Sequence, residues 1–130
     1  MFIGVLQYEY IPGNSFVGRP LYMITSPLAY YNAKVSKDIF VRVEEGFVTD
    51  FASIPSFVFF LKPKDRNWRE AAVIHDKACE MARANTITMK QADDYLYYAM
   101  LDNRSSKVAA TLFWFAVRTF HILKRVWCNW

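Results

Sequence analysis

Small and apolar residues in the second half of the chain recur at the spacing of an α-helix. They lie three or four positions apart, on one face of a helix predicted from Trp68 to about Asn85 with Asn67 as N-cap: Trp68, Ala71, Ala72, His75, Ala78, Cys79 and Ala82. A face with so many alanines lets a neighbouring element approach closely. The helix must therefore pack this face against the rest of the protein.

Two further helices follow. Residues 89–101 form a second helical pattern, with Thr88 as N-cap and Gln91 at the capping-box position. After a break at 103–106, a third helix is predicted from Ser106 or Lys107 to about Val126. Residues 67–126 are therefore expected to be helical.

The first half of the chain favours β-structure. Candidate strands cover residues 2–10, 20–25, 29–33 and 38–44, and Pro12-Gly13-Asn14-Ser15 is typical of a turn. Strands followed by helices predict an α+β fold, with a small antiparallel N-terminal sheet packed against about three C-terminal helices. Residues 1–130 are expected to form one domain, β-rich over 1–55 and helical over 67–126.

Composition limits the class of protein. With 130 residues and 54% apolar residues, the chain is long and apolar enough for a folded core. Its two cysteines, Cys79 and Cys128, give no disulfide framework and are expected to be free thiols. No basic segment precedes the apolar start, and no run reaches the about 20 residues of a membrane span, so neither a signal peptide nor a transmembrane segment is expected.

The charges are unevenly distributed along the chain. All acidic residues lie at or before Asp102, whereas residues 103–130 carry five basic residues and no acidic one. This end could contact a polyanion or, through residues 108–130, a membrane surface or partner protein. The alternative is that these residues solvate a helix whose aromatic side chains belong to the core. Nucleic-acid binding is disfavoured, because its basic residues are usually clustered more densely.

Two ionisable residues fall on the predicted buried faces. His75 lies in the middle of the first helical stripe, and Asp93 occupies the equivalent place in the second. A buried charge without a partner costs several kcal/mol, so we expect Asp93 to pair with His75. The segment Gly46–Pro55 adds Asp50 between apolar residues that should be buried. If Asp50 is carried inward with them, it meets His75, Asp76 or Asp93.

Such a cluster suits two chemistries. Asp50 and His75, with Asp76 or Asp93, could coordinate a divalent cation. Mg²⁺ or Mn²⁺ suits this set better than Zn²⁺, which usually binds at least two His or Cys residues, and the chain has only His75 and His121. Alternatively, the His–Asp pair acts without a metal, with Ser53 as nucleophile. A purely structural reading also stands, in which Asp50 caps a turn and His75 makes a fixed hydrogen bond in the core.

Two segments carry a resemblance to a known family. Residues 46–55 read G-F-V-T-D-F-A-S-I-P and residues 71–76 read A-A-V-I-H-D, with Ala92-Asp93 further on. Over about residues 38–120 the chain resembles a family of uncharacterised small phage and prophage proteins, a domain of unknown function. Many members continue I-P-R and H-D-x-L-Y, whereas this chain has Ser56 and Lys77-Ala78-Cys79. The resemblance implies a phage setting and assigns no activity.

These observations together predict a phage-encoded, hydrolase-like protein with a divalent cation as candidate cofactor. The candidate catalytic residues are Asp50, Ser53, His75, Asp76 and Asp93, and the candidate metal ligands are Asp50, His75 and Asp76. The alternative is a non-enzymatic virion or tail component, or a factor that binds a host protein through its aromatic, basic C-terminal helix. Either role places the chain in the host cytoplasm or the virion.

Overall fold

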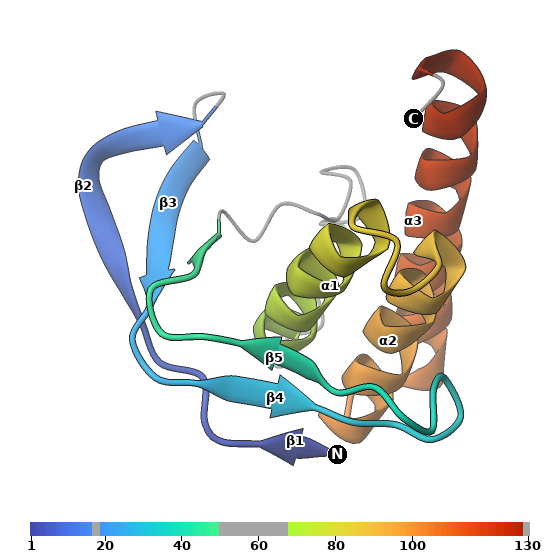
Figure 1. The fold of residues 1–130 in the computed structure, drawn as a ribbon, viewed down its shortest axis with the longest axis horizontal. Helices are drawn as coiled ribbons and strands as arrows, with labels where there is room; N and C mark the ends of the chain where they lie inside the picture. Colours follow the sequence, from blue (N-terminus) through green and yellow to red (C-terminus); the bar gives the residue numbers. More distant parts are fainter. Residues whose placement is uncertain (17–18, 50–67, 129–130) are drawn as a thin grey trace.

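The computed structural model describes residues 1–16, 19–49 and 68–128, and within them strands precede helices (Figure 1). The elements in chain order are β1 (Phe2–Ile3), β2 (Tyr8–Phe16), β3 (Arg19–Ile24), β4 (Leu28–Tyr30), β5 (Val41–Val43), β6 (Val48–Thr49), α1 (Trp68–Arg83), α2 (Met89–Asp102) and α3 (Lys107–Cys128). The strands form two small antiparallel sheets, in the orders β1-β4-β5 and β2-β3-β6. The predicted α+β class is confirmed.

The first strand differs from its prediction. Residues 2–10 were expected to form one strand, but they divide into β1 and β2, which belong to different sheets. Gly4 lies between them with φ +94°, and a Cβ at this position would lie 2.6 Å from the carbonyl oxygen of Pro27. Only glycine combines this backbone angle with so close an approach. The chain therefore bends at Gly4 and enters the second sheet.

The prediction of a turn at residues 12–15 is wrong. These residues lie within β2, where the register with β3 shifts between Ile11 and Ser15. Such a shift is typical of a β-bulge, which accommodates turn-forming residues inside a strand.

The helix ends follow local signals. Thr88 and Gln91 form the predicted capping box at the start of α2. Asn85 and Arg104 have positive φ, and the amides of Thr86 and Ser105 reach back to the carbonyls of Met81 and Met100. These are the bonds of a Schellman motif, which closes α1 and α2 and turns the chain sharply into the next helix.

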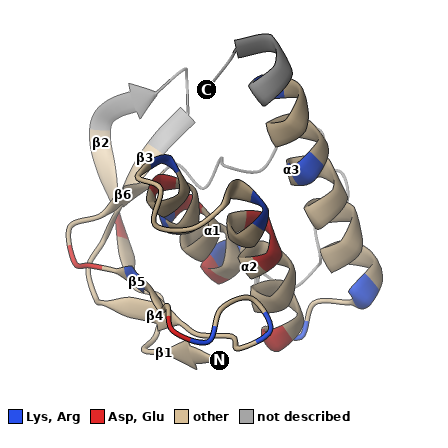
Figure 2. Ribbon diagram, turned by 45° about the vertical axis from the view of Figure 1, so that its right-hand side comes forward, with Lys and Arg blue, Asp and Glu red and all other residues tan. Residues whose placement is uncertain are grey.

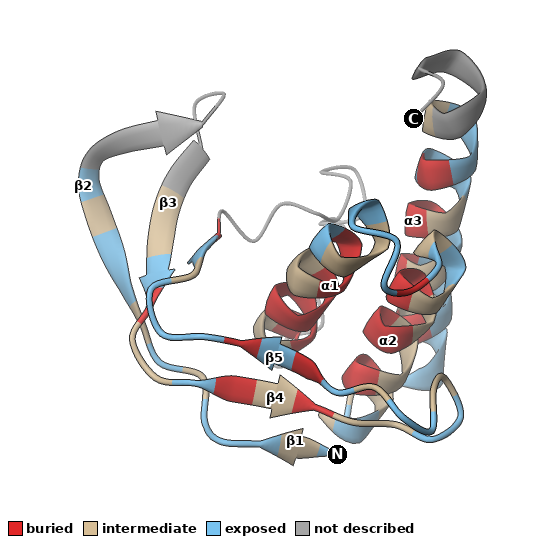
Figure 3. Cartoon of the chain, in the orientation of Figure 1, coloured by how far each residue is buried: buried red, intermediate tan, exposed pale blue. Residues whose placement is uncertain are grey.

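The core lies between the helices and the β1-β4-β5 sheet (Figure 3). Tyr30, Val41 and Val43 point inward from β4 and β5, and Tyr95 of α2 packs edge-on against Tyr30. On α1 the predicted stripe is buried from Trp68 to Cys79. None of the helices in the described residues is long and apolar enough to cross a membrane.

Candidate metal centre

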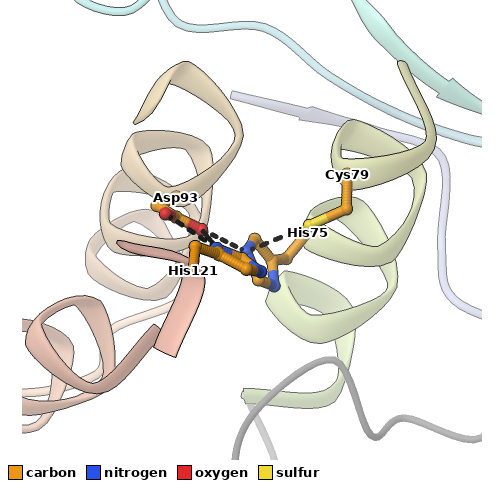
Figure 4. A group of neighbouring side chains, drawn as sticks. All are labelled: His75, Cys79, Asp93 and His121. Carbon is orange, nitrogen blue, oxygen red and sulfur yellow. Dashed lines mark hydrogen bonds and ion pairs between the residues drawn. The ribbon is translucent and has the colours of Figure 1, made fainter. Parts of the chain in front are cut away.

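Four side chains with metal-ligating atoms converge where the three helices meet (Figure 4). His75 and Cys79 lie one turn apart on α1, Asp93 comes from α2 and His121 from α3. One ligand atom from each residue lies within 4.8 Å of all the others. The small residues of α1, among them Ala72 and Ala78, are fully buried and allow α2 to come close enough for this meeting.

The individual distances are close to those of a coordination sphere. His75 Nε2 lies 2.8 Å from Asp93 Oδ1 and 3.4 Å from Cys79 Sγ, and His121 Nδ1 lies 2.8 Å from Asp93 Oδ1. In a tetrahedral zinc site, metal–nitrogen bonds of about 2.0 Å and metal–sulfur bonds of about 2.3 Å separate the ligand atoms by roughly 3.3–3.6 Å. To reach a common ion, the pairs at 2.8 Å would open by about 0.5 Å, and a pair at the upper limit of 4.8 Å would close by roughly 1.2–1.5 Å.

The cluster is removed from solvent. His75 and Asp93 are fully buried, Cys79 is 2% exposed and His121 is 7% exposed. Arg118, one turn before His121 on α3, lies 3.0 Å from Asp93 Oδ2 and donates a hydrogen bond to it. Both oxygens of Asp93 are therefore engaged, Oδ1 with His75 and Oδ2 with Arg118. His121 Nδ1 lies 2.8 Å from Oδ1 and 3.0 Å from Oδ2. A partner such as Arg118 fixes the orientation of a metal-binding carboxylate.

The ionisation of the four groups is coupled. Burial lowers the pKa of His75, but the charge of Cys79 and the hydrogen bond with Asp93 outweigh burial and raise this pKa to about 10. Burial raises the pKa of Cys79, but the charge of His75 and hydrogen bonding from His121 bring it down to about 7. Burial raises the pKa of Asp93, but hydrogen bonds to the two histidines outweigh burial and hold this pKa below its ordinary value. Burial lowers the pKa of His121, but the hydrogen bond to Asp93 outweighs burial and raises it.

Without an ion, the raised pKa values of the two histidines and the lowered pKa values of Cys79 and Asp93 favour positive imidazoles beside negative groups. With neutral imidazoles the same four groups carry a formal charge of −2, which a divalent cation neutralises. The cluster thus has the charge and the donor atoms of a cation site as well as the geometry.

His75 is not the centre of a cysteine-protease-type triad. In such a triad the cysteine and the carboxylate contact opposite nitrogens of the histidine. Here Cys79 and Asp93 both approach Nε2 of His75, so the ring cannot relay a proton from one to the other through its two nitrogens. Convergence of three donor atoms on one point is instead the geometry of metal ligands.

The residues expected at the site have different outcomes. The pairing of His75 with Asp93 is present, between buried faces of consecutive helices. Asp76 lies outside the four-residue cluster, and its Oδ2 accepts a hydrogen bond of 2.6 Å from the Thr49 hydroxyl. This bond ties the end of β6 to α1. Asp50 and Ser53 lie outside the described residues.

Sequence reasoning missed Cys79 and His121 as members of the cluster. The sequence contains a signal for Cys79, because His75 and Cys79 are four residues apart on one helix face, but a free thiol on a buried stripe is also typical of a core residue. No local pattern links His121 to them. Only the packing of α3 against α1 and α2 brings the second histidine to the first.

The comparisons with known proteins identify a family and no activity. The family model described as "Protein of unknown function (DUF1353)" matches residues 22–117, well over half of the chain. These residues include His75, Cys79 and Asp93 but end before His121. No curated protein and no solved structure matches the chain significantly.

Proposed function

We propose that the chain, which belongs to the DUF1353 family, is a phage-encoded, hydrolase-like protein that binds one divalent transition-metal ion through His75, Cys79 and His121, with Asp93 beside the ion. The observation that carries the proposal is the convergence of these four donor atoms within 4.8 Å in a buried site. Two imidazoles and a thiolate favour Zn²⁺, whereas Mg²⁺ and Mn²⁺ favour oxygen ligands. Zinc therefore replaces magnesium or manganese as the expected ion.

Hydrolysis is the chemistry that such a centre supports. A zinc ion lowers the pKa of a coordinated water to about 7 and polarises a substrate carbonyl or phosphoryl group. A catalytic arrangement needs only three protein ligands, which His75, Cys79 and His121 supply. Asp93, oriented by Arg118 at 3.0 Å, is then positioned to accept a proton. Asp50, Ser53 and Asp76 remain candidate catalytic residues.

The phage setting rests on the resemblance of residues 46–55 and 71–76 to phage and prophage proteins. In this setting the protein would act in the infected host cell or in the virion. Bacterial cell-wall material is the substrate class that such a setting favours, and we propose it as the first to test.

Neighbouring aspartates allow a matched test of the reaction. The zinc-loaded full chain is assayed on peptidoglycan and on ester, peptide and phosphodiester substrates, together with Asp93→Asn and the control Asp94→Asn. We expect hydrolysis of at least one substrate, a loss of about a hundredfold or more in Asp93→Asn with zinc retained, and wild-type activity in Asp94→Asn. Absence of turnover by the loaded wild-type chain on every substrate would overturn the hydrolase assignment.

A second candidate function follows from the burial of the site. With all four residues as ligands no position is left for water, which is the arrangement of a structural zinc site. The protein would then be a non-enzymatic virion or tail component, or a host-protein-binding factor, acting through the exposed residues of α3. Two results together would support this second function: Asp93→Asn does not retain zinc, and the wild-type chain hydrolyses none of the substrates.

A further inference from the structure

Helix α3 has two apolar sides, and only one of them packs against the protein. Its inner side contributes Ala110, Phe113 and Val117 to the core and His121 to the four-residue cluster. Its outer side carries large apolar residues that are between 40 and 69% exposed: Val108, Leu112, Phe115, Phe120, Ile122 and Leu123. Figure 3 shows exposed residues along the side of α3 that faces away from α1 and α2.

The spacing of these residues makes most of them one surface. Val108, Leu112, Phe115 and Ile122 follow one another at intervals of four, three and seven residues, which keeps them on the same side of a helix. Leu123 lies beside Ile122 on this side. We call these five residues the outer stripe. Exposed apolar residues scattered singly need no explanation, but a continuous stripe on one helix marks a surface for interaction.

The charges around the outer stripe have one sign. From residue 103 to the end of the chain there are five basic residues and no acidic one, and Figure 2 shows blue but no red on the described part of α3. Lys107 is exposed at the start of the helix, and Lys124 lies near its end with its ammonium 5.9 Å from the Phe120 ring. The nearby carboxylates of α2 are already engaged, Asp93 with Arg118 and Asp94 with Lys90 and Trp114.

We propose that the outer stripe of α3 binds an anionic lipid surface, with the helix lying in the plane of the membrane interface. An apolar helix face beside basic residues is the pattern of interfacial helices, whose apolar side enters the boundary between headgroups and acyl chains. The negative surface potential of an anionic membrane complements Lys107, which is exposed at the start of the helix. A second copy of the chain is a poorer occupant, because two α3 helices would bring basic residues together without an acidic partner on either.

This geometry also orients the protein on the membrane. The outer stripe and His121 lie on opposite sides of the same helix, so the four-residue cluster stays on the side of α3 away from the lipid. Binding to lipid therefore requires no change at the cluster, and the two proposals can fail independently.

Vesicle sedimentation tests the proposal with the full chain. Vesicles of phosphatidylcholine containing phosphatidylglycerol are compared with vesicles of phosphatidylcholine alone, for the wild type, Phe115→Ser and Lys107→Gln. The control Val5→Ser removes an equally exposed apolar side chain, 68% exposed, outside α3. The melting temperature shows that each variant is folded.

We expect binding to the anionic vesicles that falls about tenfold in Phe115→Ser, roughly fivefold in Lys107→Gln and steeply with added salt. Val5→Ser should bind as the wild type does. Equal binding to neutral vesicles, or wild-type binding by Phe115→Ser, would overturn the proposal. A third result would also overturn it: the wild-type chain does not bind vesicles, light scattering shows that it is a dimer, and Phe115→Ser is monomeric. A second copy of the chain would then cover the outer stripe.

Discussion

Nε2 of His75 lies 2.8 Å from Oδ1 of Asp93, and this contact joins the buried faces of α1 and α2. The same carboxylate receives Arg118 and His121 from α3, so one side chain connects all three helices. Removing one member of such a buried network leaves the others without their partner, which costs more than the net value of the contact. Asp93 therefore has a structural role that is distinct from metal binding.

Cys79 provides the most specific ligand test. Replacement of Cys79 by serine exchanges a thiolate for a hydroxyl that zinc binds poorly. Zinc affinity should therefore fall by at least about a hundredfold, which exceeds the loss expected for a residue that only hydrogen-bonds a ligand. In the cobalt-substituted protein, the sulfur-to-metal charge-transfer absorption should disappear. The control Cys128→Ser changes a cysteine at the end of α3 and should retain both affinity and spectrum. An unchanged spectrum in Cys79→Ser would remove the thiol from the ligand set.

The dependence of zinc binding on pH follows from the pKa shifts. In the ion-free chain the pKa of His75 is about 10 and that of Cys79 about 7, so binding near pH 7 must displace the His75 proton and part of the Cys79 proton. The raised pKa of His121 adds to this release. Affinity should therefore rise about tenfold or more per pH unit between pH 6 and pH 8. Calorimetric titration in two buffers of different ionisation enthalpy counts the released protons. Binding without proton release contradicts this account.

Zinc affinity should rise with pH, whereas the stability of the ion-free chain should fall with pH because of His75. Its folded pKa of about 10 exceeds the ordinary 6.5, so its contribution is complete below pH 6.5 and is lost as the pH rises through about 10. The zinc-induced rise in melting temperature should consequently grow from pH 6 to pH 9. His121→Ala should show no zinc-induced rise at any pH, and Asp94→Asn should behave as the wild type. A rise that shrinks with pH is the opposite result.

Arg118 is expected to position Asp93. Replacement of Arg118 by leucine leaves one oxygen of a buried carboxylate without its donor, and the side chain is only 19% exposed. Loss of this charged hydrogen bond should lower the free energy of unfolding by about 1–2 kcal/mol and zinc affinity by roughly ten- to a hundredfold. Denaturant titrations with and without zinc measure both, with Lys107→Leu as control. Equal effects in the two variants would deny Arg118 this role.

Thr88 tests the local origin of α2. Its hydroxyl accepts a hydrogen bond from the amide of Gln91, 3.0 Å away, in a complete capping box. Thr88→Ala should therefore destabilise the chain by about 1 kcal/mol. Thr86→Ala, in the turn before the cap, should stay within about 0.5 kcal/mol of the wild type. Similar melting curves for both variants would show that the Thr88 cap adds nothing to the stability that packing of α2 already provides.

Much of the helical half could be predicted from sequence because its signals are local. The stripe of α1 and the capping box at Thr88 depend on spacings of three and four residues, which any helix must satisfy. The partner of His75 was also predictable, since two ionisable residues on buried faces of consecutive helices must neutralise one another. This reasoning used burial and chain order alone.

The rest depended on contacts between distant residues. His121 joins the cluster only through the packing of α3, and its sequence context resembles any other core position. The separation of β1 from β2 depends on the close approach of Gly4 to Pro27, which lies in a different part of the chain. The turn residues at 12–15 were misleading because a β-bulge tolerates the same residue types as a turn.

Zinc content is the most direct measure of the central claim. Elemental analysis of the purified full chain, after dialysis against a weak chelator, gives the number of ions per chain. The account predicts about one equivalent of zinc in the wild type, Cys128→Ser and Asp94→Asn, and almost none in Cys79→Ser and His121→Ala, with melting temperature confirming that these remain folded. A wild-type chain that takes up no zinc, or variants that retain a full equivalent, would contradict it.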